Sequence, residues 1–230
     1  MPVSLVHEDV IDSWEHAYRK GMDKRYPTLE LVRLEKWYFG GKPGRTLDYG
    51  FGTGTNLIHL LECGYPVDGI DASQGAVTLV EQKLQRRADI RSRATLTHLD
   101  RQMARLPFAD EIFDYIVCLS VLSLLGSRER VQQLLQEFRR VMKPGAKMIV
   151  DINGQTSEFA TKGQAIGEDV FAFQLNQDDA PVPTYCPGEQ ETFVKLLEPF
   201  VVDDIGFAAH KYMRSEIFEY LACVRKPDGR

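Results

Sequence analysis

The residues best suited to chemistry form a glycine-rich turn between a predicted strand and a predicted helix. The run Asp48-Tyr49-Gly50-Phe51-Gly52-Thr53-Gly54 ends the apolar segment 46–49 and precedes a helical pattern that starts near Thr55. Glycines let a backbone approach a ligand closely, and the first turn of a helix offers N–H groups without a partner. The turn therefore predicts a site for a nucleotide-like ligand.

The spacing of these glycines narrows the choice of ligand. The dinucleotide fingerprint is G-x-G-x-x-G, and a count from Gly50 places its third glycine on Thr55, which does not fit. Asp48 lies just ahead of the turn, where a carboxylate would repel a pyrophosphate and attract an ammonium group. The pattern favours a cationic ligand over a dinucleotide.

A second acid, Asp71, follows the next strand-like run, 66–70. A carboxylate at this place in an open parallel sheet can accept hydrogen bonds from both hydroxyls of a ribose. Asp71 thus indicates an adenosine-type ribose, without deciding between the cofactors that carry one.

Four segments between residues 45 and 152 follow one another in a specific order. They are the turn in 46–56, the strand end in 67–73, Leu106-Pro107-Phe108 with the run 113–117, and the helix with its Lys143-Pro144-Gly145 turn. Together they resemble the motifs of class I S-adenosylmethionine-dependent methyltransferases. No single segment is specific to that family, but the ordered set is.

The resemblance implies a role for each matching position. The glycines would wrap the methionine part and the ribose, Asp48 would serve the amino group, and Asn56 would reach the carboxylate end. Asp100 would accept from the adenine amino group, although its distance from Leu106 is longer than the family usually has. The cofactor residues implied in this way are Asp48, Gly50, Gly52, Gly54, Asn56, Asp71, Ala72, Asp100, Met103 and Leu119.

Residues for the methyl acceptor are less clearly marked. Methyl transfer from a sulfonium needs alignment and exclusion of water, and only some acceptors need a base. Ser123 stands where related enzymes often carry a histidine, so the catalytic candidates are His16 and Tyr26 from the front of the chain. An aromatic lid could shield the sulfonium cation. The expected acceptor contacts are Tyr18, Tyr26, Ser123 and Tyr185.

Apolar strand-like runs alternate with helical patterns up to residue 152, which predicts a mostly parallel sheet with helices on both faces. Residues 1–44 are expected to form a helical cap in which Leu31, Leu34, Trp37 and Tyr38 pack inward. The polar, proline-containing stretch 153–187 has no clear periodicity and is expected to be a lid insert. Residues 188–230 should add a helix and an antiparallel strand pair, 201–209 with 216–224.

The expected fold is therefore a single α/β domain over residues 1–230, with a Rossmann-like doubly wound sheet of seven strands. The cofactor-binding core would occupy residues 45–152. Ser73 and Ser127 are expected to cap the helices that follow them.

Composition sets further limits. The chain has 230 residues, 43% of them hydrophobic, and a formal net charge of −5, which argues against a nucleic-acid partner. Its four cysteines form no C-x-x-C pair, so we expect reduced thiols, no metal and a cytoplasmic location. No apolar run reaches the roughly 18 residues of a membrane span, and no signal peptide is evident. The oligomeric state, monomer or homodimer, is left open.

The sequence as a whole predicts transfer of a methyl group from S-adenosylmethionine to an O, N or S atom of an acceptor, which we expect to be a small molecule. Three alternatives stay open at this point. They are a nicotinamide-dependent oxidoreductase, a catalytically silent module that binds S-adenosylmethionine, and a protein or peptide methyltransferase.

Overall fold

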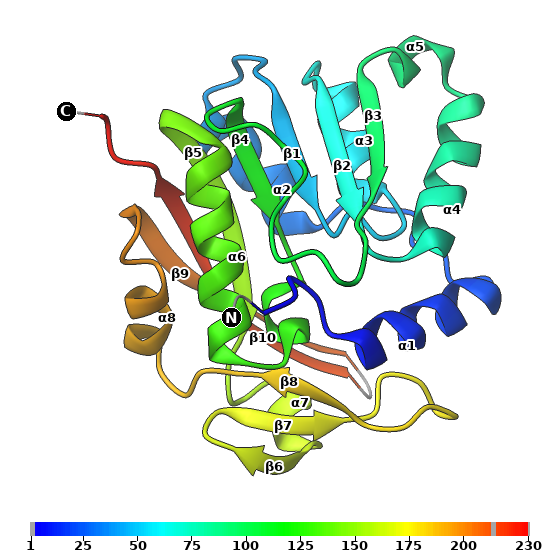
Figure 1. Cartoon of the computed structure of the whole chain (residues 1–230), viewed down its shortest axis with the longest axis vertical. Helices are drawn as coiled ribbons and strands as arrows, with labels where there is room; N and C mark the ends of the chain where they lie inside the picture. The colour runs from blue at the N-terminus through cyan, green and yellow to red at the C-terminus, as the bar shows by residue number, and fades with distance from the viewer. Residues whose placement is uncertain (1–2, 213–214, 230) are drawn as a thin grey trace.

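A seven-stranded sheet forms the centre of the computed structural model, which describes residues 3–212 and 215–229 (Figure 1). The strand order is β3-β2-β1-β4-β5-β10-β9. The first five strands run parallel, whereas β10 lies antiparallel to both β5 and β9. The strands are β1 (Thr46–Tyr49), β2 (Val67–Asp71), β3 (Ala94–His98), β4 (Phe113–Cys118), β5 (Met142–Asn153), β9 (Val201–Tyr212) and β10 (Ser215–Arg225). This confirms the predicted Rossmann-like sheet with its antiparallel C-terminal pair.

The strand order reverses between β1 and β4. The chain proceeds outward from β1 through β2 to β3 and then returns to place β4 on the other side of β1. In open α/β sheets, ligands bind outside the carboxyl ends of the strands at such a reversal. The glycine turn lies at this point, because it directly follows β1.

Helices cover both faces of the sheet. They include α3 (Thr55–Glu62), α4 (Gln74–Gln85), α5 (Ala88–Arg91), the 3-10 helix η2 (Leu122–Leu125), α6 (Arg128–Val141) and α8 (Gln190–Leu196). The side chains of β4 alternate between two cores. Ile116 and Cys118 pack with residues of α6 and α8. Val117 packs with residues of α3 and α4 on the opposite face.

Side-chain caps form where the sequence predicted them. The hydroxyl of Ser73 accepts from the N–H of Ala76 at the start of α4, and Ser127 accepts from Arg130 at the start of α6. The end of α6 differs from the prediction. The helix ends at Val141, and Pro144 and Gly145 lie inside β5. A register shift in the pairing of β4 with β5 accommodates them, since a bulge tolerates a proline that has no N–H to donate.

The front segment folds into α1 (Glu8–Arg19), α2 (Leu29–Leu34) and a π-helical turn, η1 (Glu35–Phe39). Leu31 and Tyr38 are buried, and Leu34 packs against the same core, as predicted. The prediction for Trp37 was wrong, because its side chain is 63% exposed. A π-helix has more residues per turn than an α-helix. The spacing used to choose Trp37 therefore does not mark the buried side of η1.

The stretch 153–187 is more ordered than its sequence suggested. It contains α7 (Glu158–Thr161) and three antiparallel strands, β6 (Gln164–Gly167), β7 (Val170–Phe173) and β8 (Val182–Tyr185). Strand β8 of this small sheet contacts η2, and α7 contacts β10. Figure 1 shows the small sheet at the end of the molecule away from β1, β2 and β3. Strands of four residues are too short to show an alternating pattern, and Pro183 on β8 weakens any strand prediction.

None of the helices within residues 3–212 and 215–229 has the length and apolar character needed to cross a membrane.

Candidate functional site

A cavity of about 470 Å³ lies at the carboxyl ends of the parallel strands. Its walls come from the glycine turn after β1, from Asp71 and Ala72 at the end of β2, and from Leu119 and Ser120 after β4. Residues of α1 and of the segment 22–28 form a second side of the cavity, and residues of β10 form a third side. In Figure 1 the arrowheads of β1, β2 and β3 point toward α1, which places the front segment over this edge of the sheet.

The glycine turn has the backbone that only glycine adopts easily. Gly50, Gly52 and Gly54 all have positive φ values, of +70°, +54° and +77°. A Cβ added to Gly50 would lie 2.5 Å from Cγ2 of Val121, and one added to Gly54 would lie 2.5 Å from Cγ2 of Val80. Gly50 and Gly52 line the cavity, whereas Gly54 meets α4 and lies outside the lining.

Asp71 fastens the turn to the second strand. Its Oδ2 accepts from the N–H of Gly52 at 2.8 Å, and its Oδ1 accepts from the N–H of Ser73 at 2.8 Å. Burial raises the pKa of Asp71 to about 6, and these two hydrogen bonds oppose that rise. Each carboxylate oxygen has a second lone pair. Asp71 can therefore hold the turn and still accept from two ribose hydroxyls.

Asp48 is a buried acid within β1, only 2% exposed. Its Oδ2 has no hydrogen-bond partner among the described residues. Burial raises its pKa to about 7, and the charge of Asp71 adds to the effect. Asp48 is not part of the cavity wall. A cationic group, reaching it directly or through water, would donate to the free oxygen, so this buried acceptor fits the ammonium end of S-adenosylmethionine.

Asn56 lines the cavity, but its amide is occupied by the front segment. Its Oδ1 accepts from the N–H of Thr28 at 2.9 Å, and its Nδ2 donates to the hydroxyl of Thr28 at 3.1 Å. The implied contact with the carboxylate end of the cofactor would compete with this pair. In the structure, Asn56 joins the start of α3 to the start of α2.

Two further implied cofactor residues lie outside the cavity. Asp100 is exposed and accepts from the N–H of Gln102 at 2.8 Å. Met103 is 37% exposed, and its carbonyl accepts from Leu5 at 2.9 Å. The longer loop after β3 thus packs against the N-terminal segment. Leu99, one residue before the predicted acid, lines the cavity in their place, together with the predicted Ala72 and Leu119.

Of the acceptor residues, Tyr18 and Tyr26 line the cavity. Burial raises the pKa of the Tyr18 hydroxyl well above its usual value, so the phenol stays neutral. Tyr26 is 82% exposed and stands at the mouth. Ser123 and Tyr185 are buried away from the cavity, and the Ser123 hydroxyl accepts from the N–H of Asn153 at 2.9 Å.

His16 also lies outside the cavity wall, although it belongs to α1. Its Nδ1 is 2.5 Å from Oδ1 of Asp179 in the loop before β8. The contact ties α1 to the small antiparallel sheet. The position of His16 therefore supports a role in joining the two segments rather than one in proton transfer.

The sequence prediction missed Glu219, an acid of β10 that lines the cavity. Burial and, after it, the charge of Glu30 raise its pKa to about 7, against the opposing charges of Lys24 and His210. Lys24 lines the same cavity, and His210 lies 3.1 Å from Glu30. The sequence signal that could have identified Glu219 is an acid in the middle of an apolar strand-like run.

A second buried acid, Asp151 of β5, lies behind this wall. It is 2% exposed, and its Oδ1 accepts from the N–H of Ser120 at 2.6 Å. Burial raises the pKa of Asp151 well above its usual value, and the charge of Glu219 adds to the rise. The two acids occupy neighbouring positions of the sheet, since Asp151 pairs with Leu221 and Glu219 pairs with Asn153.

The chain resembles known methyltransferases in sequence and in fold. The methyltransferase-domain family matches residues 47–150. A demethylmenaquinone methyltransferase of Beutenbergia cavernae is 30% identical over 194 residues, which make up 82% of this chain and 70% of that protein. A SAM-dependent methyltransferase of Methanosarcina mazei has a TM-score of 0.70 at 20% identity and covers 89% of this chain and 100% of its own.

A second solved structure was determined with ligands bound. It is the 1,6-didemethyltoxoflavin-N1-methyltransferase of Burkholderia thailandensis with 1,6-didemethyltoxoflavin and S-adenosylhomocysteine. Its TM-score is 0.70 at 14% identity, with 96% of this chain and 88% of that chain covered. The residues matched by the family contain the glycine turn, Asp71 and the strand order reversal. The chain belongs to the class I S-adenosylmethionine-dependent methyltransferases.

Proposed function

We propose that the protein transfers the methyl group of S-adenosylmethionine to an O, N or S atom of a small-molecule acceptor. The observation that carries this proposal is the cavity itself, which extends from the glycine turn to Glu219 between α1 and the sheet. Its volume of about 470 Å³ is in the range of small-ligand pockets and supports an acceptor of modest size.

The cofactor half of the cavity would be the wall formed by Gly50, Gly52 and Asp71. The turn brings backbone close to the ligand, and Asp71 accepts from the ribose. Asp48 would serve the ammonium group. When bound, S-adenosylmethionine supplies a methyl group activated by a sulfonium. The protein residues orient it and exclude water from it.

The acceptor half would be enclosed by aromatic side chains of the front segment. Trp14, Tyr18 and Tyr26 line the cavity from α1 and the segment that follows it. Aromatic faces attract cations, and closure over the site removes water that would compete for the methyl group. The expected rate gain comes from holding the two reactants in line at short range.

Glu219 is the candidate base for an acceptor that must lose a proton. Its carboxylate would take the proton from the attacking O, N or S atom. That atom would gain the bond to the methyl carbon as the carbon–sulfur bond breaks, and the electron pair of the broken bond would stay on sulfur. A pKa of about 7 suits this task near neutral pH. Tyr26, at the mouth, remains a proposed acceptor contact.

The test is a binding and turnover experiment on the purified chain of 230 residues. Calorimetry with S-adenosylhomocysteine and with NAD should give binding of the first alone. Mass spectrometry should then detect a methylated product from a panel of small amines, phenols and thiols. Turnover of peptides alone would favour the protein methyltransferase alternative. Binding without turnover of any acceptor would favour the silent module.

A further inference from the structure

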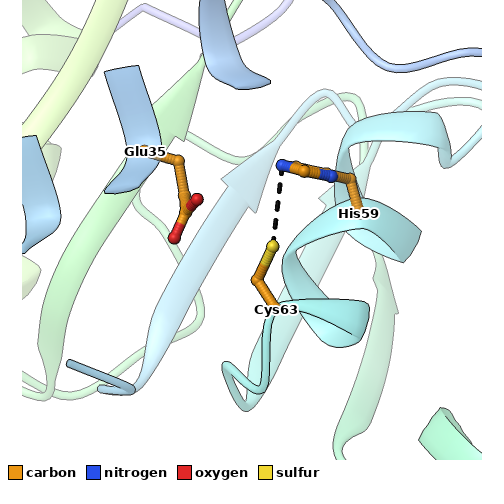
Figure 2. Close-up of side chains that lie close together, drawn as sticks. All are labelled: Glu35, His59 and Cys63. Carbon is orange, nitrogen blue, oxygen red and sulfur yellow. Dashed lines mark hydrogen bonds between the residues drawn. The ribbon is translucent and has the colours of Figure 1, made fainter. Parts of the chain in front are cut away.

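Away from the cavity, three side chains that can bind metals converge between η1 and α3. They are Glu35, His59 and Cys63 (Figure 2). One ligand atom from each lies within 4.8 Å of the other two. His59 and Cys63 are one turn apart at the carboxyl end of α3, and the Glu35 carboxylate lies opposite them in Figure 2.

The spacing of two of the ligand atoms matches that of a metal site. Sγ of Cys63 lies 3.7 Å from Nε2 of His59. Zinc binds thiolate sulfur at about 2.3 Å and imidazole nitrogen at about 2.0 Å, so tetrahedral geometry places the two ligands about 3.6 Å apart. The Glu35 oxygen lies within 4.8 Å of both atoms and would have to move closer to bind the same ion.

Burial and charge give independent support. Glu35 is only 5% exposed, and within the described residues its carboxylate has no Lys, Arg or His partner at ion-pair distance. It accepts from the hydroxyl of Tyr65 at 2.7 Å. Buried carboxylates are normally paired with a cation or coordinate a metal. Glu62, an acid at the end of α3, differs from Glu35 because it is paired with Arg87 at 2.8 Å.

We propose that Glu35, His59 and Cys63 bind a divalent transition metal, preferentially zinc. A soft sulfur with an imidazole nitrogen and a carboxylate oxygen suits zinc better than magnesium or calcium. Water would complete a four-coordinate site. Tyr65 would orient the carboxylate, as outer hydrogen bonds do in metal sites.

A metal at this site would link two segments that are distant in the sequence. Glu35 starts η1, in the front segment, whereas His59 and Cys63 belong to α3, whose first residues Thr55 and Asn56 line the cavity. A bound metal would fasten the front segment to the helix that follows the glycine turn. The inference does not depend on the acceptor or on methyl transfer.

The experiment uses the untagged chain of 230 residues after treatment with a chelator. Titration with Co²⁺ should produce the near-ultraviolet charge-transfer band of a cobalt-bound thiolate, and calorimetry with Zn²⁺ should give one equivalent. Cys63→Ser should abolish the band. Cys63→Ser and His59→Ala should each weaken zinc binding at least about tenfold. That factor is the smallest loss of affinity expected when a residue that only supports a metal ligand is replaced. Zinc should raise the melting temperature of the wild type but not of Cys63→Ser.

The matched control is Glu62→Gln, on the same helix, which should bind both metals as the wild type does. Glu35→Gln keeps an acceptor for Tyr65 and should weaken zinc binding. If that variant does not fold, Cys63→Ser carries the test, because Cys63 is exposed. Absence of saturable binding by the wild type would overturn the proposal. An unchanged cobalt spectrum in Cys63→Ser would do the same.

Discussion

The carboxylate of Asp71 accepts a hydrogen bond from the backbone N–H of Gly52 at 2.8 Å. The end of β2 therefore fixes the turn that follows β1, and the acid assigned to the ribose also shapes the glycine loop. This bond couples the glycine turn to the acid at the end of β2. Loss of the acid should therefore disturb both parts of the candidate cofactor site.

Replacement of Asp71 should be costly for the cofactor. We expect Asp71→Ala to weaken binding of S-adenosylhomocysteine by about 2–3 kcal/mol, the scale for charge-assisted hydrogen bonds left unmade. Calorimetry measures the loss. Asp100→Ala is the control, because Asp100 is exposed outside the cavity. An equal loss of affinity in both variants would again support Asp100 as the residue that accepts from the adenine amino group.

Gly50 should tolerate no side chain. Gly50→Ala places a Cβ 2.5 Å from Val121 in addition to the strain of φ +70°. Overpacking of this kind costs about 1–3 kcal/mol. Gly21→Ala is the matched control, since Gly21 has φ +86° with open space around it. We expect thermal unfolding to show a larger loss for Gly50→Ala, partly recovered by a second change, Val121→Ala. Equal losses of stability in Gly50→Ala and Gly21→Ala would assign the effect to the strain of a positive φ alone.

The fold and half of the candidate site could be predicted because the residues that indicate them lie close together in the sequence. Helices of regular spacing follow β1, β2 and β4, and Ser73 and Ser127 cap helices within three residues of themselves. Gly50 directly follows β1, and Asp71 is the last residue of β2. Parallel strands carry such residues to one edge, whatever the tertiary detail.

The rest depends on contacts between distant segments. Glu219 reaches the cavity only because β10 inserts between β5 and β9. Asp100 is drawn away by the N-terminal segment, where Arg101 pairs with Asp12 at 2.6 Å. Trp37 is exposed because η1 is a π-helical turn. The sequence marks Glu219 only as an acid within an apolar strand-like run, and no spacing of residue types records the place of β10 in the sheet, the contacts of the loop after β3 or the π-helical turn.

Tyr26 tests whether the front segment contacts the acceptor. Tyr26→Ala should lower turnover more than it lowers affinity for S-adenosylhomocysteine, because its ring stands at the mouth of the cavity. Trp37→Ala is the control, an exposed aromatic of the same segment outside the cavity. Steady-state kinetics with calorimetry separates the two effects. Wild-type values for Tyr26→Ala in both measurements would remove it from the site.

Glu219 should make stability depend on pH. Its pKa is about 7 in the folded chain and 4.5 without burial. The folded state therefore binds more protons between these values, and its stabilising contribution, complete below pH 4.5, is lost as the pH rises toward 7. Glu219→Gln should accordingly be more stable than the wild type at pH 8, by on the order of 1–2 kcal/mol. Denaturant midpoints should converge at pH 4. A constant difference at all pH values would contradict this account.

The same carboxyl should govern turnover if it accepts the acceptor's proton. Glu219→Gln should then lower kcat at pH 8 while affinity for S-adenosylhomocysteine stays near the wild-type value. Lys24 lowers the pKa of Glu219, so Lys24→Gln should move the ascending limb of the pH–rate profile to higher pH. An acceptor whose attacking atom carries no proton needs no base. With such an acceptor, Glu219→Gln should retain kcat, and a loss of equal size would assign Glu219 to acceptor binding instead.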